Sequence, residues 1–283
     1  PPKMLAGDAK EYATLHDMLH DSRVRMVSLC SPRRHQQAAD ALCVLRSGKH
    51  ALCEKPCALT ERDLDILIRE AERCGVILRE MCETVYEQPF WTLRSLIHSG
   101  MLGDVAQVFV QKSYPMHGGR PQDDETDGGL IRWVGVHALR YVEHTTGLAI
   151  REISAARTCL GNPAPGGGLT TAATLSFTLA NGGVGVAALN YLNPKGFGLW
   201  GNEHLRVFGT RGMAEITDGG ARRRLILEDR DMGAFSIADE SFDYYDRLIG
   251  LFEGRCTLPL TLEQELSPTR WAIRAHDSIG QRA

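Results

Sequence analysis

The sequence has little of what marks a membrane-spanning, nucleic-acid-binding or disulfide-bonded protein. No uninterrupted apolar segment approaches the roughly 20 residues that a membrane span requires. The formal net charge of -3 gives no electrostatic reason to expect nucleic acid or an anionic membrane as a partner. The eight cysteines form neither a Cys-x-x-Cys pair nor a dense framework. We therefore expect reduced, buried thiols and a cytoplasmic protein.

A metal site is not indicated. His16 and His20 lie one helical turn apart and could in principle hold a metal ion together. No third ligand follows nearby in the sequence. We therefore expect two surface histidines and no bound metal.

Strand and helix patterns alternate along the first part of the chain. The apolar spacing predicts, in order, residues 9–20 (helix), 24–30 (strand), 35–47 (helix), 50–54 (strand), 60–74 (helix) and a strand from 76. Thr60 is the expected N-cap of the third helix and Gly75 its terminator. This alternation is typical of right-handed βαβ units on a parallel sheet, so residues 1–85 are predicted to form a Rossmann-like nucleotide-binding domain.

The pattern changes after a predicted helix over residues 89–99. Longer apolar runs predict strands over 105–111, 171–179, 184–192, 205–208, 213–216 and 225–227, with helices near 130–146, 240–253 and 263–279. Asn181-Gly182-Gly183 is a strong hairpin signal. We predict an α/β protein in which a partial Rossmann-type parallel sheet domain is followed by an α+β domain with a large, mostly antiparallel sheet. This substrate and oligomerisation domain would span 86–283, with its C-terminal helix packing back on the first domain.

Cys53-Glu54-Lys55-Pro56 ends the strand predicted over 50–54. Ligands of open α/β sheets collect at the carboxyl ends of the strands, so a carboxylate and an ammonium at this point are candidate functional groups. Pro56 cannot donate a further ladder hydrogen bond and stiffens the bend. The alternative is a strand followed by a charged turn that binds nothing.

Several motifs together resemble the Gfo/Idh/MocA oxidoreductases. In order along the chain they are Ser31-Pro32 after a strand, Gly48-Lys49-His50 leading into Cys53-Glu54-Lys55-Pro56, residues 99–105, Gly128-Gly129 with Gly135-Val136-His137, and residues 207–212. Each motif alone is weak, but the ordered set is specific. The resemblance covers residues 10–280 and implies a nicotinamide-dependent oxidoreductase that acts on sugars, polyols or related carbinols.

The resemblance assigns the catalytic roles to Lys55 and His137. Lys55 would lie between nicotinamide and substrate, where an ammonium can hydrogen-bond the reacting oxygen and stabilise alkoxide character. His137 would be the acid/base partner, the alternative being a helix histidine satisfied by a neighbour. Glu54 would contact the cofactor or hold the lysine. The cofactor-binding residues implied in this way are Ser31, Pro32, His35, Glu54, Lys55 and Pro56.

Two positions depart from the family's pattern. The family usually has an aspartate four residues before the histidine and another three residues after it, where this sequence has Trp133 and Arg140. An indole cannot accept a hydroxyl hydrogen bond or orient the imidazole as a carboxylate does. We expect Trp133 to line the substrate pocket with Lys55 and His137 and to favour a flatter or more apolar substrate. The alternative is that Trp133 only packs between the domains.

The glycine-rich turn of a dinucleotide-binding domain is not recognisable near the start of the chain. Such a domain should open with a strand, a Gly-x-Gly-x-x-Gly turn and a helix, but Gly7 is the only glycine before Gly48. Either this sequence lacks the N-terminal βαβ unit, which we favour, or the protein lacks a standard pyrophosphate site. The expected cofactor is NAD or NADP, with the choice unreadable and binding by this chain weak.

Two other functions remain open. A non-catalytic sensor or scaffold of the same fold would have lost turnover, and the departures at Trp133 and Arg140 favour it. A lyase or hydrolase could instead use a tightly held nicotinamide as a transient hydride store. We predict the oxidoreductase, with a small-molecule substrate and no nucleic-acid or membrane partner. We further predict a homodimer or homotetramer that pairs through the antiparallel sheet.

Overall fold

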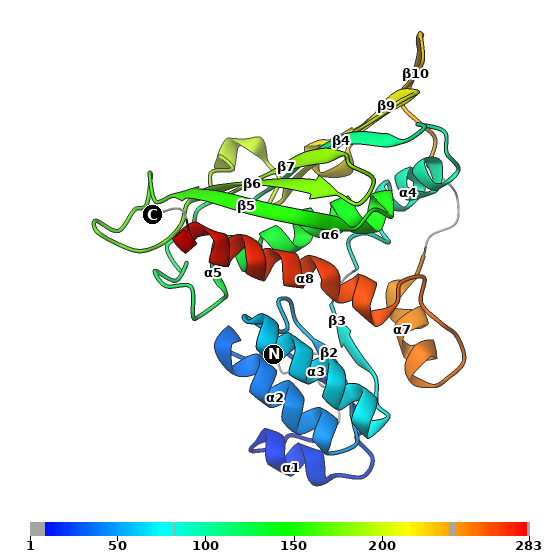
Figure 1. Cartoon of the computed structure of the whole chain (residues 1–283). Helices are drawn as coiled ribbons and strands as arrows, with labels where there is room; N and C mark the ends of the chain where they lie inside the picture. The colour runs from blue at the N-terminus through cyan, green and yellow to red at the C-terminus, as the bar shows by residue number, and fades with distance from the viewer. Residues whose placement is uncertain (1–8, 82, 238–241, 282–283) are drawn as a thin grey trace.

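A computed structural model of the chain describes residues 9–81, 83–237 and 242–281. Within these residues the strands form a three-stranded sheet, in the order β1-β2-β3, and an eight-stranded sheet, in the order β11-β10-β9-β8-β4-β7-β6-β5. Figure 1 shows the small sheet with its helices below the large sheet. The predicted fold class is confirmed. No helix in the described residues is long and apolar enough to cross a membrane.

The small sheet alternates with helices along the chain. Its elements are α1 (Leu15–His20), β1 (Met26–Leu29), α2 (Arg34–Arg46), β2 (His50–Cys53), α3 (Glu61–Cys74) and β3 (Leu78–Glu80). The side chain of Thr60 accepts a hydrogen bond from the backbone N–H of Asp63, and Gly75 ends α3 in the left-handed conformation, as predicted. Both strand pairs are parallel. The carboxyl ends of the three strands therefore meet at one edge of the sheet.

The large sheet is antiparallel except for the parallel pair β4–β7 in the described part of the chain. The elements of this half are α4 (Phe90–His98), β4 (Val105–Ser113), α5 (Gly129–Trp133), α6 (Gly135–Thr146), β5 (Ile150–Thr158), β6 (Ala172–Leu179), β7 (Val184–Asn190), η2 (Lys195–Phe197), β8 (Asn202–Gly209), β9 (Gly212–Thr217), η3 (Asp218–Gly220), β10 (Arg222–Leu227), β11 (Arg230–Gly233), α7 (Tyr244–Phe252), α8 (Leu262–Asp277) and η4 (Ser278–Gln281).

Helix α8 lies between the large sheet and the first domain (Figure 1). The carboxylate of Glu265 forms an ion pair with Arg79 at 3.1 Å and accepts a hydrogen bond from the backbone N–H of Glu80 at 2.8 Å. Further along α8, Arg270 forms ion pairs with Glu61 and Asp65 on α3. These contacts hold the last long helix against both the sheet and the helix layer of the first domain.

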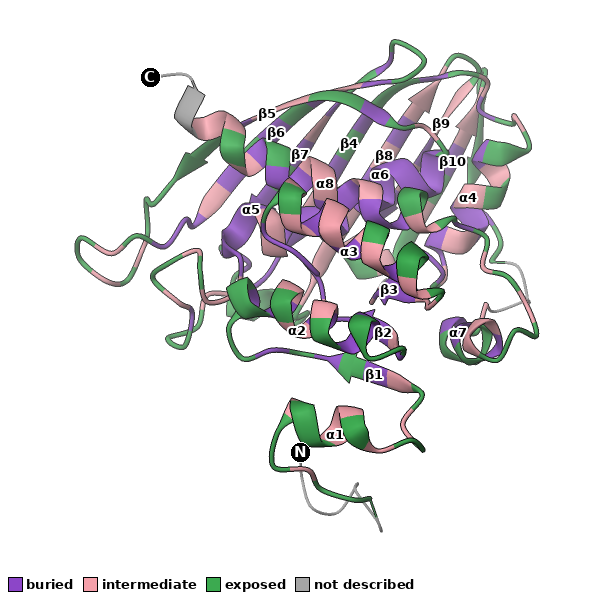
Figure 2. Ribbon diagram, turned by 60° about the horizontal axis from the view of Figure 1, so that its bottom comes forward, coloured by how far each residue is buried: buried purple, intermediate pink, exposed green. Residues whose placement is uncertain are grey.

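The two faces of the large sheet differ in exposure. Helices lie over one face, and their sheet-facing sides are buried (Figure 2). Along β6 the buried Leu175 and Phe177 alternate with the exposed Thr174 and Ser176, so the second face carries the exposed side chains. Phe109 on β4 is 40% exposed and lines a hollow on this second face.

The first predicted helix is shorter than the apolar spacing suggests. It was predicted over 9–20, but α1 begins at Leu15 because the side chain of Thr14 accepts a hydrogen bond from the backbone N–H of Asp17 and caps it. The described residues before Thr14 are not helical, and two of them bind a side chain beyond the helix instead. Lys10 and Tyr12 bind the carboxylate of Asp21, at 3.0 and 2.8 Å, beyond the end of the helix.

The predicted strands need one correction and two additions. The third strand of the small sheet is Leu78–Glu80 and does not include Val76, whose N–H bonds back to α3. Strands β5 and β11 were not predicted. β5 interrupts its apolar positions with charged residues, and all four residues of β11 are exposed, so neither shows a run of apolar side chains.

Parts of two predictions fall outside the described residues. The helix predicted over 240–253 is α7 in its described part, and residues 240–241 are not described. Cys82 is not described either, and the other seven cysteines are free thiols. The expectation that the thiols are buried holds for Cys53 and Cys57, but it is wrong for others, since Cys30 and Cys159 are exposed.

Candidate functional site

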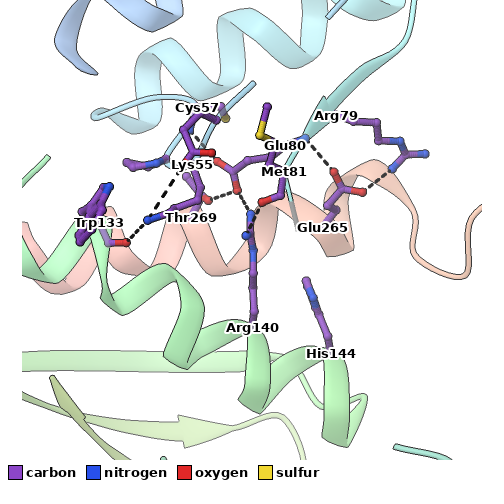
Figure 3. Close-up of polar contacts among 12 residues, drawn as sticks. Lys55, Cys57, Arg79, Glu80, Met81, Trp133, Arg140, His144, Glu265 and Thr269 are labelled. Carbon is purple, nitrogen blue, oxygen red and sulfur yellow. Dashed lines mark hydrogen bonds and ion pairs between the residues drawn. The ribbon is translucent and has the colours of Figure 1, made fainter. Parts of the chain in front are cut away.

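Lys55 lies just beyond the end of β2 and reaches across to the second domain (Figure 3). Its ammonium donates a hydrogen bond to the backbone carbonyl of Trp133 at 3.1 Å and lies 3.8 Å from the centre of the Trp133 ring. The carboxylate of Glu54 is 3.9 Å from the same ammonium. Lys55 is only 6% exposed. Lys55 and Trp133, which the sequence analysis placed in one pocket, are therefore in direct contact.

A break in the predicted helix over 130–146 creates this contact. α5 ends at Trp133 and α6 begins at Gly135, with Val134 between them. The single helix predicted near 130–146 is therefore two helices, with Trp133 at the end of the first and His137 in the first turn of the second. The break leaves the carbonyl of Trp133 to accept a hydrogen bond from Lys55, so this residue approaches the ammonium with both its carbonyl and its ring.

His137 stands in the first turn of α6 and is 9% exposed. Its Nδ1 is buried and has no hydrogen-bond partner among the described residues. Burial lowers the pKa of His137 well below its ordinary value, and the charges of Lys55 and Lys112 lower it further, so the imidazole is neutral at physiological pH.

One small cavity joins the two candidate catalytic residues. Its volume is about 150 Å³, and its lining residues are Glu54, Lys55, Met81, Glu83, Thr84, His137 and Arg140. The structure thus brings Lys55 and His137, from different domains, to the same space. Trp133 is not among the lining residues and borders the cavity through its contact with Lys55.

The ammonium of Lys55 is placed for proton transfer near neutral pH. Burial lowers the pKa of Lys55 to about 7, the neighbouring Glu54 carboxylate raises it, and the positive charges of Arg140 and Arg34 lower it again. The ammonium and the neutral amine are therefore both populated at pH 7. A lysine in that state suits general acid–base chemistry.

Glu80, at the end of β3, is a site residue that the sequence analysis missed. It forms a fully buried ion pair with Arg140, and its carboxylate also accepts hydrogen bonds from the backbone N–H of Cys57 and the hydroxyl of Thr269, both at 2.6 Å (Figure 3). Arg140 donates to the carbonyl of Met81 at 2.7 Å. A carboxylate at a strand end is the same signal that singled out Glu54.

Gln37 on α2, fully buried, holds the turn that carries Lys55. Its amide donates hydrogen bonds to the carbonyl oxygens of Glu54 and Pro56, and its oxygen accepts from Arg34 and from the N–H of Ser31. The Lys55–Pro56 peptide is cis. A polar side chain on the inner face of a helix was the signal available for Gln37.

The other predicted cofactor residues lie along the strand-end edge outside this cavity. Ser31 is buried, and its hydroxyl donates to Asp40 at 2.6 Å. Pro32 and His35 are exposed, and Nδ1 of His35 lies 3.3 Å from the carbonyl of Glu125. Pro56 is buried beside Lys55. The structure therefore groups Glu54 and Lys55 with His137 and leaves Ser31, Pro32 and His35 apart.

The cavity fits the nicotinamide end of a dinucleotide. Among the described residues, Nδ1 of His137 and the hydroxyl of Thr84 are buried without hydrogen-bond partners, and a carboxamide or a reacting oxygen can supply them. A phosphate cradle is not found in the described residues. Gly196, Gly198 and Gly201 have the Gly-x-Gly-x-x-Gly spacing, but Gly196 lies within η2 and the other two lie between η2 and β8, not between a strand and a helix.

Two family descriptions match the two halves of the chain. Residues 6–81 match the oxidoreductase family with an NAD-binding Rossmann fold. Residues 90–215 match the Gfo/Idh/MocA C-terminal domain. The two matches follow the division between the small parallel sheet and the large antiparallel sheet.

Individual relatives agree with this assignment. Over 208 residues the chain is 24% identical to myo-inositol 2-dehydrogenase of Thermotoga maritima, a match that covers 73% of this chain and 60% of that enzyme. It is 30% identical over 143 residues to 1,5-anhydro-D-fructose reductase of Ensifer adhaerens, covering 48% of this chain and 43% of the reductase. The matched segments thus span less than two thirds of these enzymes.

A solved oxidoreductase structure from Thermotoga maritima superposes on this chain with a TM-score of 0.88 and 27% identity, covering 97% of this chain and 83% of the other. Its agreement extends over both sheets. The chain belongs to the Gfo/Idh/MocA family of oxidoreductases, whose first domain is an NAD-binding Rossmann fold.

Proposed function

We propose that this protein is an NAD(P)-dependent oxidoreductase that transfers hydride between the nicotinamide and a carbinol or carbonyl carbon of a sugar, a polyol or a related compound. One observation carries the proposal. Lys55 and His137, from different domains, line one small cavity, and the pKa of Lys55 is lowered to about 7. Family membership and the dehydrogenase and reductase relatives support the same reaction class.

In the proposed mechanism Lys55 handles the proton of the reacting oxygen. The nicotinamide, when bound, supplies or accepts the hydride. During oxidation the neutral amine of Lys55 takes the proton from the carbinol hydroxyl as the C–H bond breaks, and during reduction the ammonium returns it to the carbonyl oxygen. The Trp133 carbonyl holds the Lys55 side chain in place at 3.1 Å.

His137 has a different role in this mechanism. Its lowered pKa keeps the imidazole neutral, so it does not store the proton. Its free Nδ1 is a hydrogen-bonding atom inside the cavity and orients the reacting oxygen toward Lys55. The Glu54 carboxylate, 3.9 Å from Lys55, raises the pKa of Lys55 and so stabilises the ammonium form.

Cofactor binding and product analysis test the proposal. NADH and NADPH are titrated separately, and each is then tested for turnover with polyols and sugars. Binding of one cofactor with a matching net change in its redox state supports the oxidoreductase. Binding without net redox change but with a rearranged product supports the lyase or hydrolase. If neither cofactor binds and no substrate turns over, the result supports the sensor or scaffold.

We also propose that the exposed face of the large sheet pairs two copies of the chain. This face carries Phe109, 40% exposed, and Val184, 46% exposed, and a hollow of about 470 Å³ lies over it between strands β4, β5, β6 and β7. An exposed sheet face with apolar side chains is typical of an interaction surface. A homodimer or homotetramer is the assembly that the family resemblance favours.

A further inference from the structure

An aromatic wall continues from Trp133 away from the cavity. The Trp133 ring lies 5.7 Å from the ring of Tyr114 and 6.4 Å from that of Tyr191, centre to centre. The guanidinium carbon of Arg120 is 3.5 Å from the centre of the Tyr191 ring and 5.8 Å from that of Trp133. Since Lys55 also lies over Trp133, two cations from different loops approach the same aromatic surface.

In the part of the chain that the structure describes, Arg120 has no counter-ion in contact, although only 7% of the residue is exposed. In the described residues it forms no ion pair within 4.0 Å, its Nη2 donates a hydrogen bond to the carbonyl of Pro115 at 3.0 Å, and its buried Nε has no hydrogen-bond partner. Two other buried cations do have counter-ions, because Arg140 is paired with Glu80 and Lys112 with Glu203.

Asp127 is not in contact with Arg120 as a counter-ion. It attracts both Arg120 and Lys55 from beyond ion-pair distance, and its carboxylate accepts a hydrogen bond from the N–H of Gly129 at 2.9 Å. A buried guanidinium with an unpaired donor is unfavourable unless an anion completes it. Arg132, twelve residues further along the chain from Arg120, has its guanidinium bonded to three backbone carbonyls and needs no such partner.

We propose that Arg120 binds a carboxylate of the substrate, so that the substrate is a sugar acid or polyol acid. The inference rests on the proposed function and specifies its substrate class. The planar fork of a guanidinium matches a carboxylate with two parallel hydrogen bonds, and the free Nε is one of its donors. The carbon skeleton lies along Trp133, which places its carbinol toward Lys55.

Equilibrium binding with matched ligands tests the proposal. Each acid is compared with a neutral partner of the same skeleton: D-glucuronate with D-glucose, D-galacturonate with D-galactose, and D-gluconate with D-glucitol. Binding is measured by quenching of tryptophan fluorescence in the presence of whichever of NADH and NADPH binds. We expect at least one acid to bind tenfold or more tightly than its neutral partner, the range of one charge-assisted hydrogen bond.

Three variants separate recognition from folding. Arg120→Gln should remove the preference for the acid and leave binding of the neutral partner within about threefold. Arg120→Lys keeps the charge without the fork and should retain part of the preference. Arg132→Gln is the matched control, a nearby arginine bonded only to backbone, and should keep the full preference even if its melting temperature falls.

Several outcomes would overturn the proposal. They are equal binding of acid and neutral partner in all three pairs, binding of no acid at all, tighter binding of glucose 6-phosphate than of glucuronate, or an unchanged preference in Arg120→Gln. Turnover of neutral polyols without any preference for acids would leave the oxidoreductase standing and refute the role of Arg120. Binding of acids by Arg120 without hydride transfer would support the role of Arg120 and refute the oxidoreductase.

Discussion

Arg140 and Glu80 form an ion pair in which both side chains are fully buried, and this pair joins the end of β3 to helix α6. Arg140 stands where the family usually has an aspartate, three residues after the histidine. The exchange therefore does not leave the position empty, because the guanidinium supplies the counter-charge to a strand-end carboxylate. Glu80 in turn binds the loop after Lys55, so the pair supports the geometry of the cavity.

Breaking this pair should be strongly destabilising. Arg140→Met leaves the Glu80 carboxylate buried without its counter-ion, which costs about 3–5 kcal/mol in the free energy of unfolding. Arg157→Met is the control, because its ion pair with Asp124 at 3.5 Å is partly exposed and should contribute less than about 1 kcal/mol. Urea unfolding measures both. A loss for Arg140→Met no larger than the control's would contradict the prediction.

Lys55→Met should abolish most of the activity. The variant loses the group that exchanges a proton with the reacting oxygen, which should cost on the order of 3 kcal/mol, or about a hundredfold in kcat. Steady-state rates are measured with the cofactor that the wild-type protein binds, and cofactor affinity is measured in parallel. Turnover within a few-fold of the wild type would show that Lys55 is not catalytic.

The pH dependence of the two reaction directions should be opposite. The lowered pKa of Lys55, about 7, means that the neutral amine predominates above pH 7 and the ammonium below it. Oxidation needs the amine as proton acceptor, so its rate should rise through pH 7, while reduction needs the ammonium and should slow. In Lys55→Arg, whose guanidinium stays protonated, the inflection near pH 7 should disappear. Its persistence would assign the titration to another group.

The exposed sheet face should control the oligomeric state. Phe109→Asp places a charge on the exposed face of β4 and should shift the protein to a monomer in light scattering at micromolar concentration. Leu160→Asp is the control, because Leu160 is 82% exposed in the loop that follows β5, and its change should leave the mass unaltered. A wild-type protein that is already monomeric at this concentration would refute the predicted pairing.

Trp133 should set how many hydroxyl groups the substrate carries. Its ring faces the Lys55 ammonium at 3.8 Å, and an indole offers one N–H donor and a broad apolar face but no acceptor for a hydroxyl. Trp133→Asp should therefore shift the ratio of kcat/KM values toward cyclic polyols and away from less hydroxylated substrates. Trp133→Phe keeps an apolar ring and should preserve the original order. The same order in the aspartate variant would reduce Trp133 to a packing role.

Local signals in the sequence were enough for many elements of this fold. The cap at Thr60 and the terminator Gly75 act within one helical turn, so the chain around them determines where α3 begins and ends. The hairpin at Asn181-Gly182-Gly183 likewise follows from its own turn residues. The end of β2 at Cys53-Glu54-Lys55-Pro56 could be located from an apolar run and a proline.

The sequence by itself determined the fold class, most of the helices and strands, and the candidacy of Lys55 and His137, because these follow from apolar periodicity, short-range hydrogen bonds and an ordered set of motifs. Only the tertiary structure decided that Arg140 pairs with Glu80, that a break at Val134 presents the Trp133 carbonyl to Lys55, and that Arg120 is buried without a counter-ion among the described residues. Each of these contacts joins or isolates residues that are far apart in the chain, and their energies depend on burial, which no local pattern contains.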